Sequence, residues 1–198
     1  MLFQSLEFLK EQLNLYLDSF PTDDPPNVQR PIAKLENIAG LDEVALKDID
    51  NVLLTLVNVS EEPTLKNTPP YVKAYPNTIY NNPPIFLNLF VLFTACLKKY
   101  DHALVLLSRI VQFFQGKNTF NNKNSTTQVK DLENFTMIMD LYSLTFEQSN
   151  YLWSTLGGKQ HPFALYKLRL VQMERESTEE IRGIIKEITV NENTGIIL

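Results

Sequence analysis

The sequence predicts one α/β (α+β) domain, in which helices pack on a mixed or antiparallel sheet, followed by an extended C-terminal arm. Two observations predict this class. Stretches with the period of amphipathic helices alternate with β-branched and aromatic runs of strand length, in the order helix, strands, helix, strand, helix, strand. A chain of 198 residues is also long enough for one domain with a substantial core. We expect this domain to span residues 1–173 and the arm to span residues 174–198.

The first element is predicted to be an amphipathic helix. Its apolar residues are spaced by three and four positions and therefore share one helical face; they are Leu2, Leu6, Leu9, Leu13 and Leu17. The helix ends before Pro21, and a loop rich in proline and aspartate follows. Alternating apolar and polar residues over Ile32–Ile38 then predict a short, half-buried strand.

The middle of the chain is predicted to contain two strands joined by a long connection. Val52–Val59 is rich in leucine and β-branched residues, and this strand ends near Glu61, ahead of a proline that cannot donate to a ladder. Thr68–Pro84 is rich in proline, asparagine and tyrosine, which predicts an ordered but irregular connection. The run IFLNLFVLF, residues 85–93, predicts a central strand that is covered on both faces.

A second helix is predicted over residues 98–115. Asp101 is its candidate N-cap and Gly116 its candidate C-cap. Apolar residues recur in it at helical spacing, namely Ala103, Leu104, Leu107, Ile110, Val111 and Phe114.

Another aromatic strand is predicted over Phe135–Leu144, and a helix follows it. Thr145 opens this helix with a capping box, because its hydroxyl can accept from the amide of Gln148 while the Gln148 side chain reaches back. Gly157 and Gly158 are predicted to end the helix.

The last predicted strand is Phe163–Met173, where residues alternate and one face is mostly apolar. Residues 177–198 are open to two interpretations. The sequence STEEIRGII fits a capped helix, whereas KEITVNENTGIIL fits an extended chain.

Composition argues against several classes of function. The net charge is −5 and the 18 lysines and arginines are scattered, so no basic stripe is available for nucleic acid. Cys96 is the only cysteine, so an intrachain disulfide cannot form. The N-terminus lacks a signal-peptide pattern, and the longest apolar run, Ile85–Leu97, is too short to cross a bilayer. We therefore expect a chain made in the cytoplasm without membrane insertion.

No catalytic, cofactor or metal site is predicted. His102 and His161 are far apart, and each lacks further ligands at metal-site spacing. Cys96 lies in an apolar run, which favours a small buried side chain over a nucleophile. The sequence Gly157-Gly158-Lys159 lacks the phosphate-loop frame. An enzyme whose site residues are dispersed along the chain is one alternative to a structural protein.

The interface candidates come from three places in the sequence. Adjacent strand residues point to opposite faces, so two neighbouring glutamates suit solvation or a partner contact better than acid–base chemistry. Two aromatic residues in the third helix suit core packing first and a subunit contact second. The β-prone end ITVNENTGIIL suits an arm that pairs with a strand of another subunit. The candidates from these three places are Glu61, Glu62, Tyr151, Trp153, Ile196, Ile197 and Leu198, and Lys159, which follows the two glycines, is a further candidate.

Four segments together carry a family resemblance. They are DNVLLTLVNVSEEPTLKN (50–67), PPIFLNLFVLFTA (83–95), IVQFFQGKNTF (110–120) and LYSLTFEQSNYLWSTLGGK (141–159). In this order and spacing they resemble the tail-terminator, or cap, proteins of contractile injection systems of the antifeeding-prophage type. The resemblance extends from the first helix to about Val171.

This resemblance implies a structural protein that closes the distal end of the inner tube as a ring and joins the last sheath ring to it. The implied partners are further copies of the chain, the inner-tube protein and the sheath protein, with no cofactor. The sixfold symmetry expected of the tube implies a hexamer. It also implies assembly in the cytoplasm into an injection particle. Another structural component of the same particle, such as a baseplate or tube-initiator protein, is the second alternative.

Overall fold

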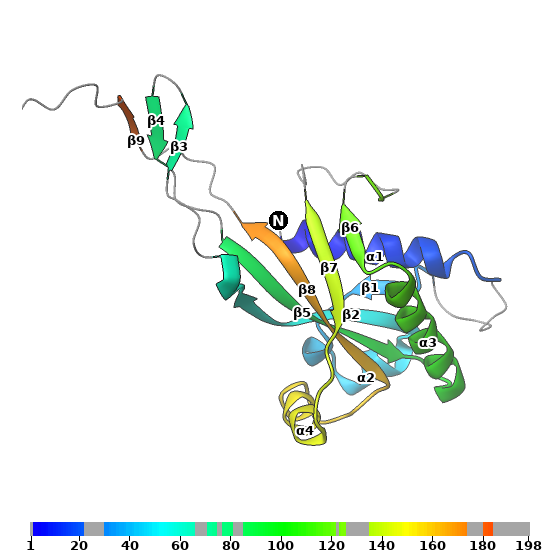
Figure 1. Ribbon diagram of the computed structural model, residues 1–198. Coiled ribbons are helices and arrows are strands. Elements are labelled where there is room, and N and C mark those ends of the chain that lie inside the picture. Colours follow the sequence, from blue (N-terminus) through cyan, green and yellow to red (C-terminus); the bar gives the residue numbers. More distant parts are fainter. Residues whose placement is uncertain are drawn as a thin grey trace, which may run out of the picture.

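A six-stranded mixed sheet forms the centre of the structure, which is a computed structural model (Figure 1). The structure describes residues 2–21, 30–65, 71–74, 77–80, 85–121, 123–125, 135–173 and 180–183. The strand order is β1-β2-β5-β8-β7-β6; β1 and β2 are parallel and all other neighbours are antiparallel. The strands are β1 (Ala33–Leu35), β2 (Asn51–Glu61), β5 (Ile85–Cys96), β6 (Thr119–Asn121), β7 (Thr136–Leu141) and β8 (Phe163–Met173). The predicted fold class is confirmed.

The central strand is β5, which pairs with β2 on one side and with β8 on the other. Leu89, Val91 and Phe93 belong to the apolar core on one face of the sheet. Leu92 and Cys96 belong to a second core on the opposite face. Because successive strand residues point to opposite faces, a run that is apolar at nearly every position must be covered on both. This prediction from the run IFLNLFVLF is confirmed for residues 89–93, whereas Ile85 at the start of the strand is 50% exposed.

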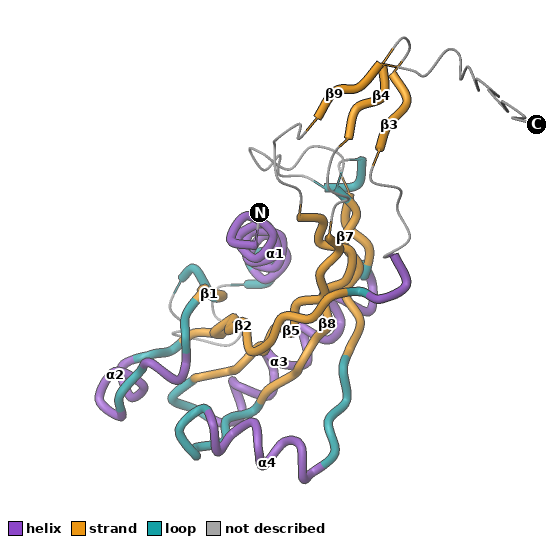
Figure 2. The backbone as a smooth tube through the Cα atoms, turned by 90° about the vertical axis from the view of Figure 1, so that its left-hand side faces the viewer, coloured by secondary structure: helices purple, strands orange, loops and turns teal. Residues whose placement is uncertain are grey.

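Helices α1 (Leu2–Leu17) and α3 (Tyr100–Gly116) cover the first face of the sheet. The predicted stripe of α1 packs inward: Leu9, Leu13 and Leu17 have no exposed surface. The side chain of Asn14 also completes the sheet edge, because its amide donates to the carbonyl of Ala33 (2.9 Å) and its oxygen accepts from the amide of Ala33 (2.8 Å). Viewed along the sheet, α1 lies on one side and α4 (Phe146–Thr155) at the other (Figure 2).

Among the described residues, three short elements cover the second face, and they lie at one end of it. These are the 3-10 helix η1 (Ile38–Gly40), helix α2 (Glu43–Asp48) and α4. The predicted capping box of α4 is present, with Thr145 and Gln148 bonded reciprocally at 3.0 and 3.2 Å. Gly157 and Gly158 then adopt positive φ angles of 110° and 81°, which glycine tolerates without a Cβ penalty. The predicted end of the helix is confirmed.

The ends of α3 differ from the prediction. The helix begins at Tyr100, and its N-cap is Lys99, which makes no side-chain capping bond. Asp101 lies inside the first turn, where its carboxylate accepts from the amide of His102 (3.0 Å). Gly116 is the last helical residue, and the cap is Lys117. Both predicted caps are therefore wrong. At the N-terminal end, the start of the helix follows a connection from β5 that a distant contact holds, the amide of Lys98 donating to Asp50 (3.1 Å).

Two strands are shorter than predicted, and one helix was not predicted. The 3-10 turn capped by Asn37 interrupts the predicted strand Ile32–Ile38 after Leu35. The strand predicted over Phe135–Leu144 ends at Leu141, where the chain turns toward α4. Helix α2 has an Asp42 N-cap that accepts from the amide of Ala45 (2.7 Å).

A second, three-stranded sheet lies beyond the ends of β5 and β8 (Figures 1 and 2). Its strands are β3 (Tyr71–Ala74), β4 (Asn77–Tyr80) and β9 (Glu180–Gly183), in the order β3-β4-β9; the 3-10 helix η2 (Pro63–Leu65) precedes it. The prediction of an irregular connection over Thr68–Pro84 is therefore wrong for the residues of β3 and β4. The helical interpretation of STEEIRGII is wrong for β9. β3 and β4 pair as a local hairpin. β9 pairs with β4 from about 100 residues further along the chain, and such a distant pairing leaves no local pattern.

We expect substitution of Phe93 by alanine to lower the free energy of unfolding by about 3–5 kcal/mol, because it leaves a cavity in the largest core. Phe93 has no exposed surface, and its ring lies 5.3 Å from Phe114 and 5.5 Å from Tyr166. The control Leu15→Ala changes a side chain that is 54% exposed and should cost under about 0.5 kcal/mol. Urea denaturation measures both, and equal losses would contradict this assignment of the core.

Candidate assembly surface

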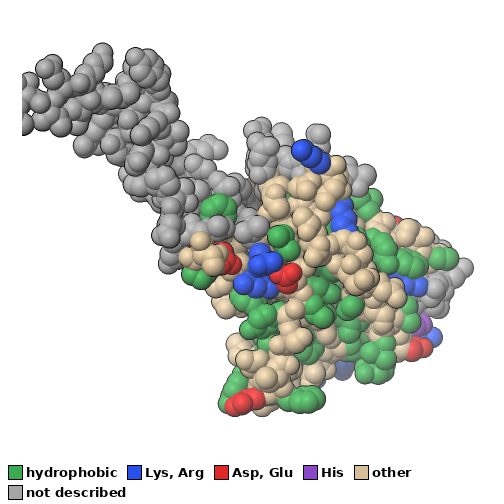
Figure 3. Space-filling model, in the orientation of Figure 1, with side chains coloured by type: hydrophobic (Ala, Val, Ile, Leu, Met, Phe, Trp, Pro, Cys, Tyr) green, Lys and Arg blue, Asp and Glu red, His purple; other side chains and the backbone are tan. Residues whose placement is uncertain are grey.

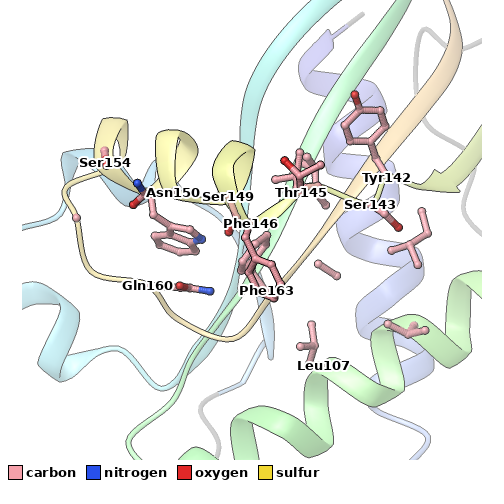
Figure 4. Close-up of a pocket in the computed structure, with 17 residues that line it drawn as sticks. Leu107, Tyr142, Ser143, Thr145, Phe146, Ser149, Asn150, Ser154, Gln160 and Phe163 are labelled. Carbon is pink, nitrogen blue, oxygen red and sulfur yellow. The ribbon is translucent and has the colours of Figure 1, made fainter.

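A groove of about 860 Å³ opens between α3 and α4 at the start of β8 (Figure 4). None of the 17 residues that line it is charged. Apolar and aromatic side chains form most of its lining, and serine, threonine, asparagine and glutamine supply the polar groups. The lining includes Leu107, Val111, Leu141, Tyr142, Thr145, Phe146, Ser149, Trp153, Gln160, Phe163 and Leu165.

The groove exists because β7 does not extend along the first residues of β8, so the two strands pair only from Tyr166 onward. Leu141 pairs with Tyr166, and the amide of Tyr142 donates to the carbonyl of Leu165 (2.8 Å). The chain then crosses to the N-terminus of α4. Phe163 and Ala164 consequently pair only with β5 in the described ladder. The first turn of α4 and the middle of α3 stand on the two sides of this open edge.

Helix α3 carries apolar residues on two faces. The inner face is buried and consists of Ala103, Leu106, Ile110, Phe113 and Phe114. An outer stripe follows the spacing four, three, four and consists of Tyr100, Leu104, Leu107 and Val111. The periodic set predicted from the sequence mixes the two faces: Leu104 is 42% and Val111 36% exposed.

Three further apolar side chains beside the groove are exposed. Phe146, the first residue of α4, is 98% exposed, Leu141 is 55% exposed and Tyr142 is 40% exposed. Together with the outer stripe of α3 they form what we call the α3–α4 surface: Tyr100, Leu104, Leu107, Val111, Leu141, Tyr142 and Phe146. Large exposed apolar surfaces on proteins mark contact sites. The α3–α4 surface is therefore the candidate site for assembly.

Charged side chains lie on the second face of the sheet, on the half that η1, α2 and α4 do not cover (Figure 3). Asp140 and Arg169, on β7 and β8, form an ion pair at 2.6 Å. Lys167 lies 4.0 Å from Glu62, and the buried side chain of Asn88 donates to the same carboxylate at 3.0 Å. The positive and negative side chains named here thus pair with one another within the chain. This half of the face is polar, in contrast to the apolar α3–α4 surface.

Hydrogen bonds lower the pKa of Glu62. The largest cause is the donor from Asn88, followed by the hydroxyl of Thr64, which donates to the carboxylate at 2.7 Å. The positive charge of Lys167 adds a smaller effect in the same direction. Because the folded chain favours the ionised form, Glu62 stabilises the fold above its ordinary pKa and loses this effect as the pH falls.

The structure separates the interface candidates predicted from the sequence. Trp153 is 4% exposed, lies in the second core against Phe163 (5.4 Å between rings) and lines the groove. Tyr151 is 63% exposed on α4, outside the groove lining. Glu61 is exposed at the end of β2, and Lys159 is exposed beside a smaller cavity of about 100 Å³. Ile196, Ile197 and Leu198 lie outside the described residues.

Sequence reasoning missed most of the α3–α4 surface. The signal was present in α3, which has more apolar residues than one helical face can hold. Phe146 gave no such signal, because a single aromatic residue in a capped first turn is compatible with burial. Only the path of the chain between β7 and α4 exposes it.

Cys96 and His161 lie in packed surroundings, in which burial shifts the pKa of each side chain. Cys96 is 3% exposed, and burial raises the pKa of its thiol to about 12, in line with the predicted small buried side chain. Burial and the nearby charge of Lys159 lower the pKa of His161. Among the described residues, histidine, cysteine, aspartate and glutamate form no group of three that could hold a metal ion. No helix in that part of the chain is long and apolar enough to span a bilayer.

Comparison with known families assigns the chain. Residues 6–187 match the family described as the Pvc16 N-terminal domain. The chain belongs to this family. The resemblance to contractile-injection-system terminators inferred from four sequence segments is confirmed, and the match continues past Val171 to include β9. No curated protein matches the chain in sequence.

Two solved structures share the fold of this Pvc16 N-terminal domain. One is the sheath/tube terminator, in its extended state, of the extracellular contractile injection system PVC. Its TM-score is 0.65 at 11% identity, and the match covers 100% of this chain and 65% of that one. The other is the tube-terminating cap of the anti-feeding prophage, with a TM-score of 0.59 at 10% identity over 94% of this chain and 59% of that one. The chain thus spans less than two thirds of the length of either.

We expect Glu62→Gln to reduce stability at neutral pH and to lose this effect in acid. The folded-state pKa of Glu62 is lowered from an ordinary value of 4.5, so its contribution is complete well above pH 4.5 and declines as the pH falls below it. Urea denaturation between pH 3 and pH 7 measures the difference between the two proteins. Asn88→Ala, which removes the strongest donor, should weaken the same pH dependence. A difference that stays constant across this range would contradict the assignment.

Proposed function

We propose that this chain is a structural cap of a contractile injection particle. In this proposal it closes the distal end of the inner tube as a ring and links that ring to the last sheath ring. Its partners are further copies of itself, the inner-tube protein and the sheath protein. It assembles in the cytoplasm into a particle of the kind that acts outside the cell, and its role is structural rather than enzymatic.

The single observation that carries the proposal is the family match over residues 6–187. The fold likeness supports it, since both similar structures are described as terminators or caps of such particles. The chain shares the terminator fold along its whole length. A role that needs only this domain, such as ring formation, is better supported than one that depends on the additional length of those proteins.

The α3–α4 surface supplies a physical basis for assembly. A cap must contact its neighbours strongly enough to close a ring, and apolar side chains that lose water on contact provide most of such affinity. Phe146 and Tyr100, 98% and 68% exposed, are the most exposed side chains on this surface. A hexamer is the stoichiometry that would match a sixfold tube, because contacts that close into a ring leave no lateral end free.

A baseplate or tube-initiator role is the competing structural proposal, and it differs in the end of the tube that is bound. Electron microscopy of the purified particle, with a tag on the chain, separates the two. Density at the end distal to the baseplate supports the cap.

We expect Phe146→Asp to weaken self-association of the chain by about tenfold or more, as loss of an aromatic interface anchor does. The isolated fold should keep its stability, because Phe146 is 98% exposed and an aspartate in the first turn of a helix is favourable. Native mass spectrometry, with and without tube protein, measures the ring. The matched control is Phe3→Asp, which changes a 67% exposed phenylalanine in the first turn of α1. Equal loss from both variants, or a strict monomer of the unmodified chain under both conditions, contradicts the proposal.

Deletion of the gene should leave tubes and sheaths that vary in length or are unstable at the distal end, because polymerisation is no longer capped. Electron microscopy of particles from the deletion strain measures this length distribution. The unmodified chain and Phe3→Asp should restore uniform length, whereas Phe146→Asp should not. Particles of normal length with intact distal caps in the deletion strain would exclude a terminator role, and loss of baseplates would favour the competing proposal.

A further inference from the structure

The floor of the groove is an open sheet edge. In an antiparallel ladder, the amide and carbonyl of every second residue point to the same neighbour. The carbonyl of Leu165 points to the β7 side, where it accepts from Tyr142 (2.8 Å). Phe163, two residues earlier, therefore presents its backbone to the same side, but β7 pairing ends at Tyr166. A strand laid in the groove could use this edge, as in β-augmentation.

The walls of the groove set the chemistry of such a strand. Leu107 and Val111 of α3 form one wall, and Phe146 and Trp153 of α4 belong to the other. With no charged residue in the lining, a charged segment would lose its hydration without gaining a partner. The fitting ligand is an extended segment with apolar, preferably β-branched, side chains and little charge.

One segment of this chain has that composition. Residues 188–198, ITVNENTGIIL, carry a single charged side chain, Glu192, and are rich in β-branched residues. They lie outside the described residues. Their sequence, and not a conformation, is what matches the groove.

The position of β9 favours the groove of a second copy over the chain's own. The groove lies at the Phe163 end of β8, while β9 lies beyond the Met173 end (Figures 1 and 2). β8 has 11 residues, which corresponds to about 36 Å at roughly 3.3 Å per residue. The chain from Gly183, the last residue of β9, to Ile188 spans at most about 18 Å when fully extended. This connection is too short to bring residues 188–198 from the Met173 end of β8 back to the groove of the same chain.

We infer that the α3–α4 groove of one copy binds residues 188–198 of a second copy as an added strand at the open edge of β8. This inference rests on the proposed ring and specifies one of its contacts. The groove and residues 188–198, which we call the tail, are different parts of the chain, so the contact between copies is head-to-tail. Such contacts generate rings when the rotation closes.

Disulfide trapping between full-length chains tests the inference. Val111→Cys places a thiol in the groove, and Ile197→Cys places one in the tail. The matched control is Val105→Cys, on the same helix and similarly exposed (37% against 36%) but outside the groove lining. The native Cys96 is buried, so the introduced thiols react selectively.

Mixing Val111→Cys chains with Ile197→Cys chains under oxidising conditions should yield a covalent dimer. Its yield should exceed that of the Val105→Cys mixture by about tenfold or more, because a docked tail raises the local thiol concentration. Circular dichroism checks that each variant is folded. As a second readout, Ile197→Asp in the otherwise unmodified chain should change the emission of Trp153, the only tryptophan, which lines the groove.

Four results would overturn the inference. Equal crosslinking of Val105→Cys and Val111→Cys would mean that the tail does not select the groove. Crosslinking only within a chain that carries both Val111→Cys and Ile197→Cys would place the tail in its own groove. A ring seen by native mass spectrometry without any crosslink at Val111→Cys would reject the tail contact and leave the proposed cap intact. Absence of both ring and crosslink would reject both proposals.

Discussion

Burial of β5 on both faces is the constraint on which the rest of the structure depends. A strand with apolar side chains at nearly every position is stable only inside a covered sheet. Helices α1 and α3 supply one cover, and α4 with α2 supplies the other. To reach the second face, the chain must leave β7 at Leu141 and cross to Thr145. The groove at the start of β8 is a direct consequence of covering the central strand twice.

The same arrangement explains why apolar and charged surfaces are separated. The end of the second face that α4 covers borders on the α3–α4 surface, where the lining of the groove is uncharged. The other end carries Lys167 near Glu62 and Arg169 bonded to Asp140. Charges that are paired within one chain contribute little to affinity for another, although they influence orientation and encounter. In the proposed assembly, apolar contacts at the groove are thus the stronger source of affinity.

The two ends of β8 differ in kind, and this asymmetry suits a ring-forming subunit. One end borders the open edge and the groove, and the other leads toward the small sheet of β3, β4 and β9 (Figure 1). A subunit with unlike ends can join its neighbours head-to-tail, whereas a single self-complementary patch produces a dimer. The sheet edge at β1 is closed by the side chain of Asn14, which reduces pairing on that side.

The sequence by itself determined the elements whose signals are local. The leucine spacing of α1, the apolar runs of β2 and β5, and the capping box at Thr145 each depend on residues within a few positions of one another. Only the tertiary structure decided which apolar residues of α3 face the core, because Leu104 and Leu106 are equally hydrophobic and differ only in what the sheet covers. It also decided the β3-β4-β9 sheet, in which Ile79 pairs with Ile181. Hydrogen bonds of the β4–β9 ladder join residues about 100 positions apart and leave no period in either segment, so no local pattern could have predicted that pairing, unlike the local hairpin of β3 and β4.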